Sequence, residues 1–151
     1  NQRTYCMKIK TLLWRMALSG CASIFLATLG TAADIDKGRE IFDEHCVVCH
    51  THIQGLMDKS GPNLYGLFNR QAGTANYRFG YSEPIARSGI EWVNLNLNLF
   101  LAAPARMVPG TKMVFRGLDD AGDRTNLICY LQHATNTGGQ PISSDCEELE
   151  N

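Results

Sequence analysis

Apolar side chains recur at helical spacing at both ends of the segment from residue 34 to residue 137. In its first part, Ile41, Phe42 and His45 fall on one face of a helix that Asp36 can cap and that we expect to run through Cys49. In its last part we expect a helix from about residue 120 to residue 135, capped by Asp119 or Asp120. The core face of this last helix would carry Leu127, Tyr130, Leu131 and Ala134.

The pattern between these helices is less regular. Residues 53–91 are rich in Gly, Asn, Ser and Pro, which in an ordinary domain would argue against compact packing. From Trp92 to Leu101, Leu alternates with Asn at a period of two, which is typical of a strand, although no partner strand is evident. A domain of this kind needs an apolar core that its loops do not supply themselves.

The N-terminal segment has the layout of an exported protein's signal peptide. Basic residues follow Met7, an uncharged run extends from Met16 to Leu29, and small residues lead up to Ala33. The run is shorter than the roughly twenty residues that a membrane-spanning helix needs. We expect an upstream remnant and signal peptide at 1–33, cleaved near Ala33, with an uncleaved anchor or a lipoprotein acylated at Cys21 as the alternatives.

Length and composition narrow the class of protein. A chain of 151 residues with 44% hydrophobic and 19% charged residues fits one globular domain and excludes a large multidomain enzyme or a disordered chain. The net charge of -1 hides a segregation, because residues 45–118 carry 7 bases and 3 acids whereas residues 119–151 carry 1 base and 7 acids. We expect a domain at 34–137, an acidic tail at 138–151 and no nucleic-acid partner.

The chemistry is concentrated in Cys46-Val47-Val48-Cys49-His50, which is the C-x-x-C-H signature of covalent haem attachment. One helical turn separates the two thiols, so each can form a thioether with a haem vinyl group, and His50 can then reach the iron. A thioredoxin-like pair would need alternating strands and helices. A zinc site would need a second pair at metal spacing, and a simple disulfide would leave His50 unexplained.

A second axial ligand should come from elsewhere in the chain. His45 and His52 lie too close to the attachment motif to reach the opposite face of the haem, which leaves His133, Met57, Met107 and Met113. Met113 follows a Pro-Gly turn that could present its thioether inwards.

Residues 36–136 resemble mitochondrial cytochrome c and its soluble bacterial periplasmic relatives, the class I c-type cytochromes. The resemblance rests on Gly61-Pro62-Asn63-Leu64, Gly66-Leu67-Phe68, Gly89-Ile90 with Trp92, Pro109-Gly110-Thr111-Lys112-Met113 and Phe115, and on Gly38 and Phe42 in the first helix with Leu127 and Tyr130 in the last. It implies an all-α cytochrome c fold, in which helices and long loops wrap one covalent haem c, and a helix over the segment that begins at Trp92.

The same resemblance implies the roles of individual residues. His50 and Met113 would be the axial ligands, and Pro62 would offer its carbonyl to the imidazole. Arg70, Tyr81 and Trp92 would hold a haem propionate. The chain departs from mitochondrial members at Phe100, where they usually carry a Tyr, and at Ile85, where they carry a buried Asn.

We therefore expect a monomeric periplasmic electron carrier and not an enzyme, because two protein ligands leave the iron no open position for a substrate. Its partners would be cytochrome bc1-type complexes, terminal oxidases or periplasmic dehydrogenases, and it would meet the membrane only through them. The alternatives are a haem enzyme or ligand sensor with a displaceable Met113, and a membrane-tethered electron-transfer subunit.

Two further expectations concern the surface. Cys129 and Cys146 are the thiols that remain once the signal and haem cysteines are set aside, and we expect them to form a disulfide. The basic middle of the chain should surround the exposed haem edge and steer it towards an acidic partner. Candidate contacts are Lys59, Arg106, Lys112 and Arg116.

Overall fold

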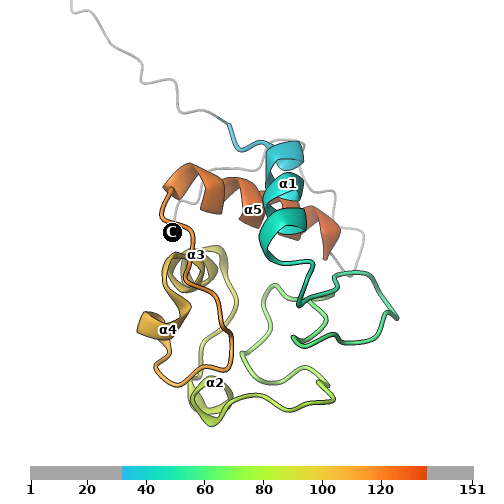
Figure 1. Cartoon of the computed structure of the whole chain (residues 1–151), viewed down its shortest axis with the longest axis vertical. Helices are drawn as coiled ribbons and strands as arrows, with labels where there is room; N and C mark the ends of the chain where they lie inside the picture. The colour runs from blue at the N-terminus through green and yellow to red at the C-terminus, as the bar shows by residue number, and fades with distance from the viewer. Residues whose placement is uncertain (1–31, 136–151) are drawn as a thin grey trace, which may run out of the picture. The chain divides into compact units, whose positions relative to one another are not determined.

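The computed structural model describes residues 32–135, and it is helical. Within these residues five helices follow one another (Figure 1): α1 (Ile35–His45), α2 (Glu83–Arg87), α3 (Asn94–Ala102), α4 (Pro104–Met107) and α5 (Ala121–Ala134). The extended pairing in the described part is one isolated antiparallel bridge between Gln71 and Glu91. The predicted all-α fold is therefore confirmed for these residues.

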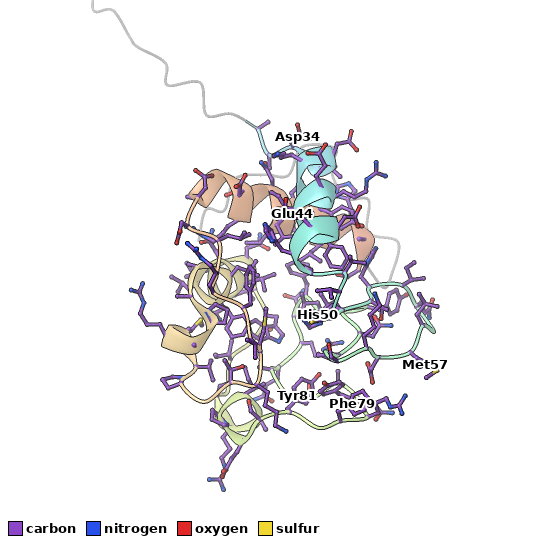
Figure 2. The ribbon with its side chains drawn as sticks, in the orientation of Figure 1. Asp34, Glu44, His50, Met57, Phe79 and Tyr81 are labelled. Carbon is purple, nitrogen blue, oxygen red and sulfur yellow. The ribbon has the colours of Figure 1, made fainter. Side chains whose placement is uncertain are left out.

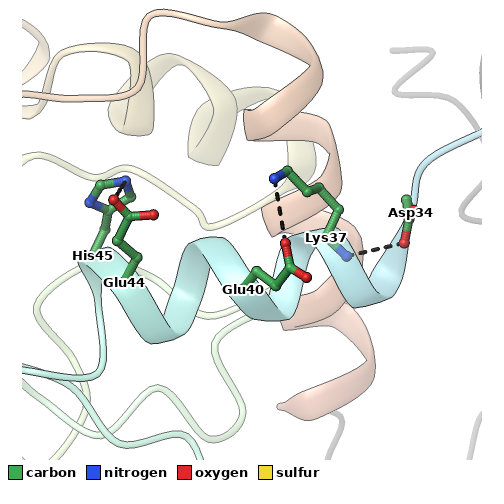
Figure 3. A network of polar contacts seen from close by, with 5 residues as sticks. All are labelled: Asp34, Lys37, Glu40, Glu44 and His45. Atoms are coloured by element: carbon green, nitrogen blue, oxygen red, sulfur yellow. Dashed lines mark hydrogen bonds and ion pairs between the residues drawn. The ribbon is translucent and has the colours of Figure 1, made fainter.

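Helix α1 begins and ends earlier than the sequence analysis predicted. Its cap is Asp34 and not Asp36, because the Asp34 carboxylate accepts a hydrogen bond from the Lys37 amide at 3.1 Å. The helix ends at His45, and Cys46 to Cys49 form turns. Figure 3 shows the exposed side of α1, where Lys37 pairs with Glu40 at 3.4 Å and His45 lies 3.8 Å from Glu44. These exposed pairs contribute little to stability.

Helices α1 and α5 cross at a close contact that a glycine permits (Figure 1). A Cβ atom on Gly38 would overlap the Asn126 carbonyl oxygen and lie 2.8 Å from Tyr130 Cβ. Beside this contact, the side chains of Phe42 and Leu127 have no exposed surface. Burying two such side chains favours folding by roughly 1.5–3 kcal/mol each.

The last helix follows the predicted pattern. Asp120 caps it by accepting a hydrogen bond from the Asp123 amide at 2.8 Å, as expected for one of the two candidates. Leu127 and Leu131 are buried, while Tyr130 is partly buried and packs against the same core.

The Leu and Asn alternation that suggested a strand belongs to helix α3. Leu97, Phe100 and Leu101 are buried in the core, whereas Leu95 and Leu99 remain about half exposed. Asn94 and Asn98, one helical turn apart, face α5: Asn94 accepts from Gln132 at 2.9 Å and Asn98 accepts from Arg124 at 2.9 Å. The third asparagine, Asn96, donates to the Glu91 carbonyl at 2.9 Å. The period of two therefore reflects polar contacts of a helix and not a pleated surface.

A long connection without helices runs from the end of α1 to α2 and forms the green half of Figure 1. The segment after α4 returns to α3, where the Leu118 amide donates to the Leu101 carbonyl at 2.9 Å. Gly117 makes this return with a φ of 107°, and a Cβ there would overlap the Ala102 carbonyl.

Within residues 32–135 no helix is both long enough and apolar enough to cross a bilayer. The predicted signal peptide, with its alternatives at Cys21, lies almost wholly outside the described residues, and so does the acidic tail. The predicted domain boundaries stay predictions.

Candidate functional site

The two cysteines of the attachment motif lie in the turn that leaves α1. The Cys46 carbonyl accepts hydrogen bonds from the Cys49 amide at 3.0 Å and the His50 amide at 2.8 Å. The turn therefore holds Cys46, Cys49 and His50 within one turn of chain, and the two thiols interact electrostatically. Burial, with a smaller effect of Cys49, raises the pKa of the free Cys46 thiol, before haem attachment, to about 12.

The orientation of His50 is fixed by Pro62. The His50 Nδ1 atom lies 2.8 Å from the Pro62 carbonyl oxygen. A carbonyl can only accept, so Nδ1 carries the proton and Nε2 keeps a lone pair for a metal. Burial lowers the pKa of His50, although the Pro62 bond opposes that shift, and the imidazole is neutral. Gly61 permits this approach, since a Cβ there would lie 2.5 Å from His50 Cε1.

The candidates for the second ligand differ in their surroundings. Met113 is partly buried against the core, in a loop where its amide donates to Thr111 Oγ1 at 3.2 Å. Met107 also packs against the core, whereas Met57 is 70% exposed at the outer bend of its loop (Figure 2). His133 lies on α5, with Nδ1 3.4 Å from the Cys129 carbonyl oxygen. Among these candidates, Met113 is the one that is both partly buried and in a loop, as expected of a thioether presented inwards to a cofactor.

The two histidines beside the attachment motif have other contacts. His45 is beside Glu44 and faces the ring of Phe115 at 6.1 Å. His52 Nε2 lies 3.1 Å from the Tyr130 hydroxyl, and its ring packs edge-on against Phe42 at 4.7 Å. Sequence reasoning did not foresee that His52 joins the attachment segment to both crossing helices.

Two of the three predicted propionate residues are paired through the backbone. The Trp92 amide donates to the Arg70 carbonyl at 3.0 Å, beside the bridge between Gln71 and Glu91. The Arg70 guanidinium donates to the Tyr65 carbonyl at 2.9 Å, and burial lowers its pKa. Tyr81 interacts electrostatically with Arg70, and burial raises the pKa of its hydroxyl despite that cation.

One polar side chain that the sequence did not single out is a further candidate to hold a haem propionate. Ser82 is 7% exposed, and its hydroxyl is the one buried side-chain polar atom without a hydrogen-bond partner in the described residues. Unpaired buried hydroxyls are costly and therefore rare. Ser82 is the N-cap of α2 but makes no side-chain capping bond, so its hydroxyl is available to donate to a ligand such as a haem propionate. The signal in the sequence was only a small hydroxyl residue next to a predicted site residue.

The apolar surroundings also fit a haem. Leu64, Phe68, Ile90 and Phe115 pack against the core yet are only partly buried, as are Tyr81, Met107 and Met113. Such a set of half-covered large side chains suits a flat, apolar cofactor. No group of three or more His, Cys, Asp or Glu side chains among residues 32–135 could hold a metal ion.

An all-α domain with a C-x-x-C-H turn, a neutral imidazole held by a carbonyl and a partly buried loop methionine defines the class of c-type haem proteins. The cytochrome c family profile matches residues 35–135. The chain is 43% identical over 102 residues to a cytochrome c from Theileria parva, covering 68% of this chain and 87% of that protein. It is 39% identical over 104 residues to a cytochrome c from Nigella damascena, covering 69% of this chain and 93% of that protein.

The chain therefore belongs to the cytochrome c family. It is an electron-carrier haem protein with one covalently bound c-type haem, and it exchanges electrons with redox partners.

The predicted bacterial periplasmic location is wrong. The relatives are eukaryotic and include, besides the two above, a cytochrome c from Chlamydomonas reinhardtii that is 41% identical over 104 residues, 69% of this chain and 92% of that protein. The error arose because a basic start followed by an apolar run describes export in bacteria but does not establish the organism. The expectation of periplasmic dehydrogenases as partners is withdrawn with it.

Proposed function

We propose that this protein carries single electrons between respiratory complexes, with His50 and Met113 as the axial ligands of a haem bound through Cys46 and Cys49. The observation that carries the proposal is the His50 imidazole, which the Pro62 carbonyl holds with its Nε2 atom available to iron. A thioether on the other side favours the ferrous state and a high reduction potential. The domain then has no open iron position and does not act as an enzyme.

We further propose the mitochondrial intermembrane space as its location, and bc1-type complexes and terminal oxidases as its partners. Support comes from the eukaryotic relatives, each named cytochrome c. Subcellular fractionation of the source organism, with outer-membrane rupture releasing the protein, would test the location.

The docking surface that we propose is basic but smaller than the four predicted contacts suggest. Lys59 donates to the Val47 carbonyl, and Arg116 pairs with Asp119 at 2.8 Å. Arg106 and Lys112 are exposed and make no ion pair with the described residues. Lys59 is also exposed and bonds only a neutral carbonyl, so Lys59, Arg106 and Lys112 keep uncompensated charges for a partner.

The ligand proposal is tested by Met113→Ala, with the exposed Met57→Ala as a matched control and Met107→Ala for the competing methionine. We expect Met113→Ala alone to abolish the weak long-wavelength absorption of a sulfur-ligated ferric haem, to let cyanide bind rapidly and to lower the reduction potential. Unchanged absorption in Met113→Ala, or its loss in Met107→Ala alone, would refute the assignment. Rapid cyanide binding by the unmodified protein would favour the ligand-sensor alternative.

A further inference from the structure

The loop behind His50 is held together by one asparagine and one aspartate. Asn63 Nδ2 donates to the carbonyls of Ile53 at 2.9 Å and Leu56 at 2.8 Å, and Asn63 Oδ1 accepts from the Tyr65 amide at 2.9 Å. The Asn63 amide donates to Asp58 Oδ1 at 2.8 Å. Pro62, whose carbonyl holds His50, is the residue directly before Asn63.

The second oxygen of Asp58 reaches a different loop. Asp58 Oδ2 accepts a hydrogen bond from the Arg78 amide at 3.1 Å, so the partly buried carboxylate joins residues 58–63 to residues 77–82. A second link runs beside it, from the Tyr77 hydroxyl to the Ser60 carbonyl. Residues 77–80 lead directly to Tyr81 and Ser82. Figure 2 shows Tyr81 and Phe79 on the loop that lies below His50 in this view.

One carboxylate therefore connects the loop that orients the imidazole to the loop that carries the hydroxyls of Tyr81 and Ser82. Both of its oxygens accept from backbone amides, and a bond to a charged acceptor is stronger than one between neutral groups. A partner of a ligating histidine that raises the electron donation of the imidazole stabilises the ferric state. The negative charge of Asp58 acts in the same direction, and it is close enough to Tyr81 to contribute to the raised pKa of that hydroxyl.

We propose that Asp58 is a positioning residue for electron transfer, which lowers the reduction potential by keeping the Pro62 carbonyl on His50 and by its own charge. The proposal rests on His50 being an iron ligand. Asp58 makes no bond to the imidazole; its positioning effect runs through the Asn63 amide, which belongs to the same peptide group as the Pro62 carbonyl, and its charge acts through space.

The test compares Asp58→Asn and Asp58→Ala in the haem-loaded protein. Asn keeps one acceptor oxygen and loses the charge, whereas Ala loses both. Asp36→Asn is the control, because it removes one charge from an exposed side chain whose single ion pair, with Arg39, is long at 4.0 Å. Tyr77→Phe removes the other link between the loops without changing the charge.

The readouts are the reduction potential and the solvent exchange of the His50 Nδ1 proton, measured by NMR in the ferrous protein. We expect a potential that rises in the order Asp36→Asn, Asp58→Asn, Asp58→Ala, and at least tenfold faster exchange of the imidazole proton in Asp58→Ala. Tyr77→Phe should accelerate the same proton to a smaller extent.

Equal reduction potentials in Asp58→Ala and Asp58→Asn, with unchanged exchange of the imidazole proton, would show that Asp58 acts only through its charge. That result would overturn the positioning role. Potentials no higher than that of Asp36→Asn would overturn the whole proposal. If Asp58→Ala does not fold, the exchange of the His50 Nδ1 proton in Asp58→Asn and Tyr77→Phe tests the positioning role. Exchange as slow as in the unmodified protein in both variants would then overturn it. The ferric absorption of the unmodified protein reports separately on His50 and Met113, so a failure of the ligand assignment is distinguishable.

Discussion

At the scale of single residues, the site depends on groups whose role follows from what each can donate or accept. The Pro62 carbonyl sets the tautomer of His50, and the buried hydroxyl of Ser82 has no partner among the described residues and is available to a polar group of the haem. His50 and Pro62 were named from sequence because both stand in recognisable motifs. Ser82 was missed because its burial comes from the folding of distant segments.

Replacing Ser82 with Ala tests its contact with a haem propionate. A hydroxyl that donates to a carboxylate favours the ionised form and lowers its pKa, so removing the hydroxyl should raise the propionate pKa. We expect the pH range over which the reduction potential changes to move upwards in Ser82→Ala and to return in Ser82→Thr. Ser88→Ala is the control, since Ser88 Oγ is already bonded to the Ile85 carbonyl at 2.9 Å. Identical pH profiles for both alanine variants would show that Ser82 does not contact the propionate.

At the scale of elements, the sequence predicted the helices well where local rules dominate and less well where tertiary contacts do. The Asp120 cap of α5 and its buried leucines follow from capping and helical spacing. The period of two in α3 could not be interpreted locally, because Asn94 and Asn98 are explained only by Gln132 and Arg124 on α5. The earlier start of α1 depends on Asp34, whose amide donates to the Asn126 side chain at 2.8 Å.

The crossing of α1 and α5 should be sensitive to a single methyl group at Gly38. A Cβ there would meet the Asn126 backbone and Tyr130, neither of which can move without shifting α5. We expect Gly38→Ala to lower the free energy of unfolding by about 1–3 kcal/mol, the usual cost of overpacking, although alanine favours helix formation. Denaturant unfolding of the haem-loaded protein measures this change in the free energy of unfolding. Gly122→Ala in α5 is the control, where the nearest atom is a side-chain oxygen, the capping Asp120 Oδ1 at 3.0 Å, and not the backbone of a neighbouring helix. Equal stability of the two variants would contradict the close crossing.

At the scale of the whole molecule, a covalent link is expected between α5 and the acidic tail. Cys129 on α5 is 1% exposed and disulfide-bonded. Cys146 lies outside the described residues, so its pairing with Cys129 stays a prediction. We expect the haem-loaded protein without residues 1–33, and so without Cys6 and Cys21, to show no alkylatable thiol before reduction and a peptide joining the two cysteines after digestion. Such a loop stabilises by roughly 3 kcal/mol, which Cys146→Ser should remove. Two thiols that react under non-reducing conditions would contradict the pairing.

The distribution of charge over the molecule sets the direction in which it approaches a partner. Residues 34–44 carry 2 bases and 5 acids, and residues 45–118, which supply every proposed haem contact, carry 7 bases and 3 acids. Asp119 offsets the charge of Arg116, whereas Lys59 bonds only a neutral carbonyl and keeps its charge. Of the four candidate contacts, Lys59, Arg106 and Lys112 therefore carry the uncompensated charge.

Electron transfer to an acidic partner such as a cytochrome oxidase should therefore slow as ionic strength rises, because salt screens the attraction of this basic face over about one Debye length. At low salt, Lys112→Glu and Arg106→Glu should each reduce the association rate severalfold. Arg116→Glu should have a smaller effect, since Asp119 already offsets that charge. Arg39→Glu on α1 is the matched control. Stopped-flow measurement of the electron-transfer rate of each variant across a series of salt concentrations tests this prediction. A rate that increases with salt would mean that the acidic net charge of the whole chain outweighs the patch, and the docking face would have to be sought elsewhere.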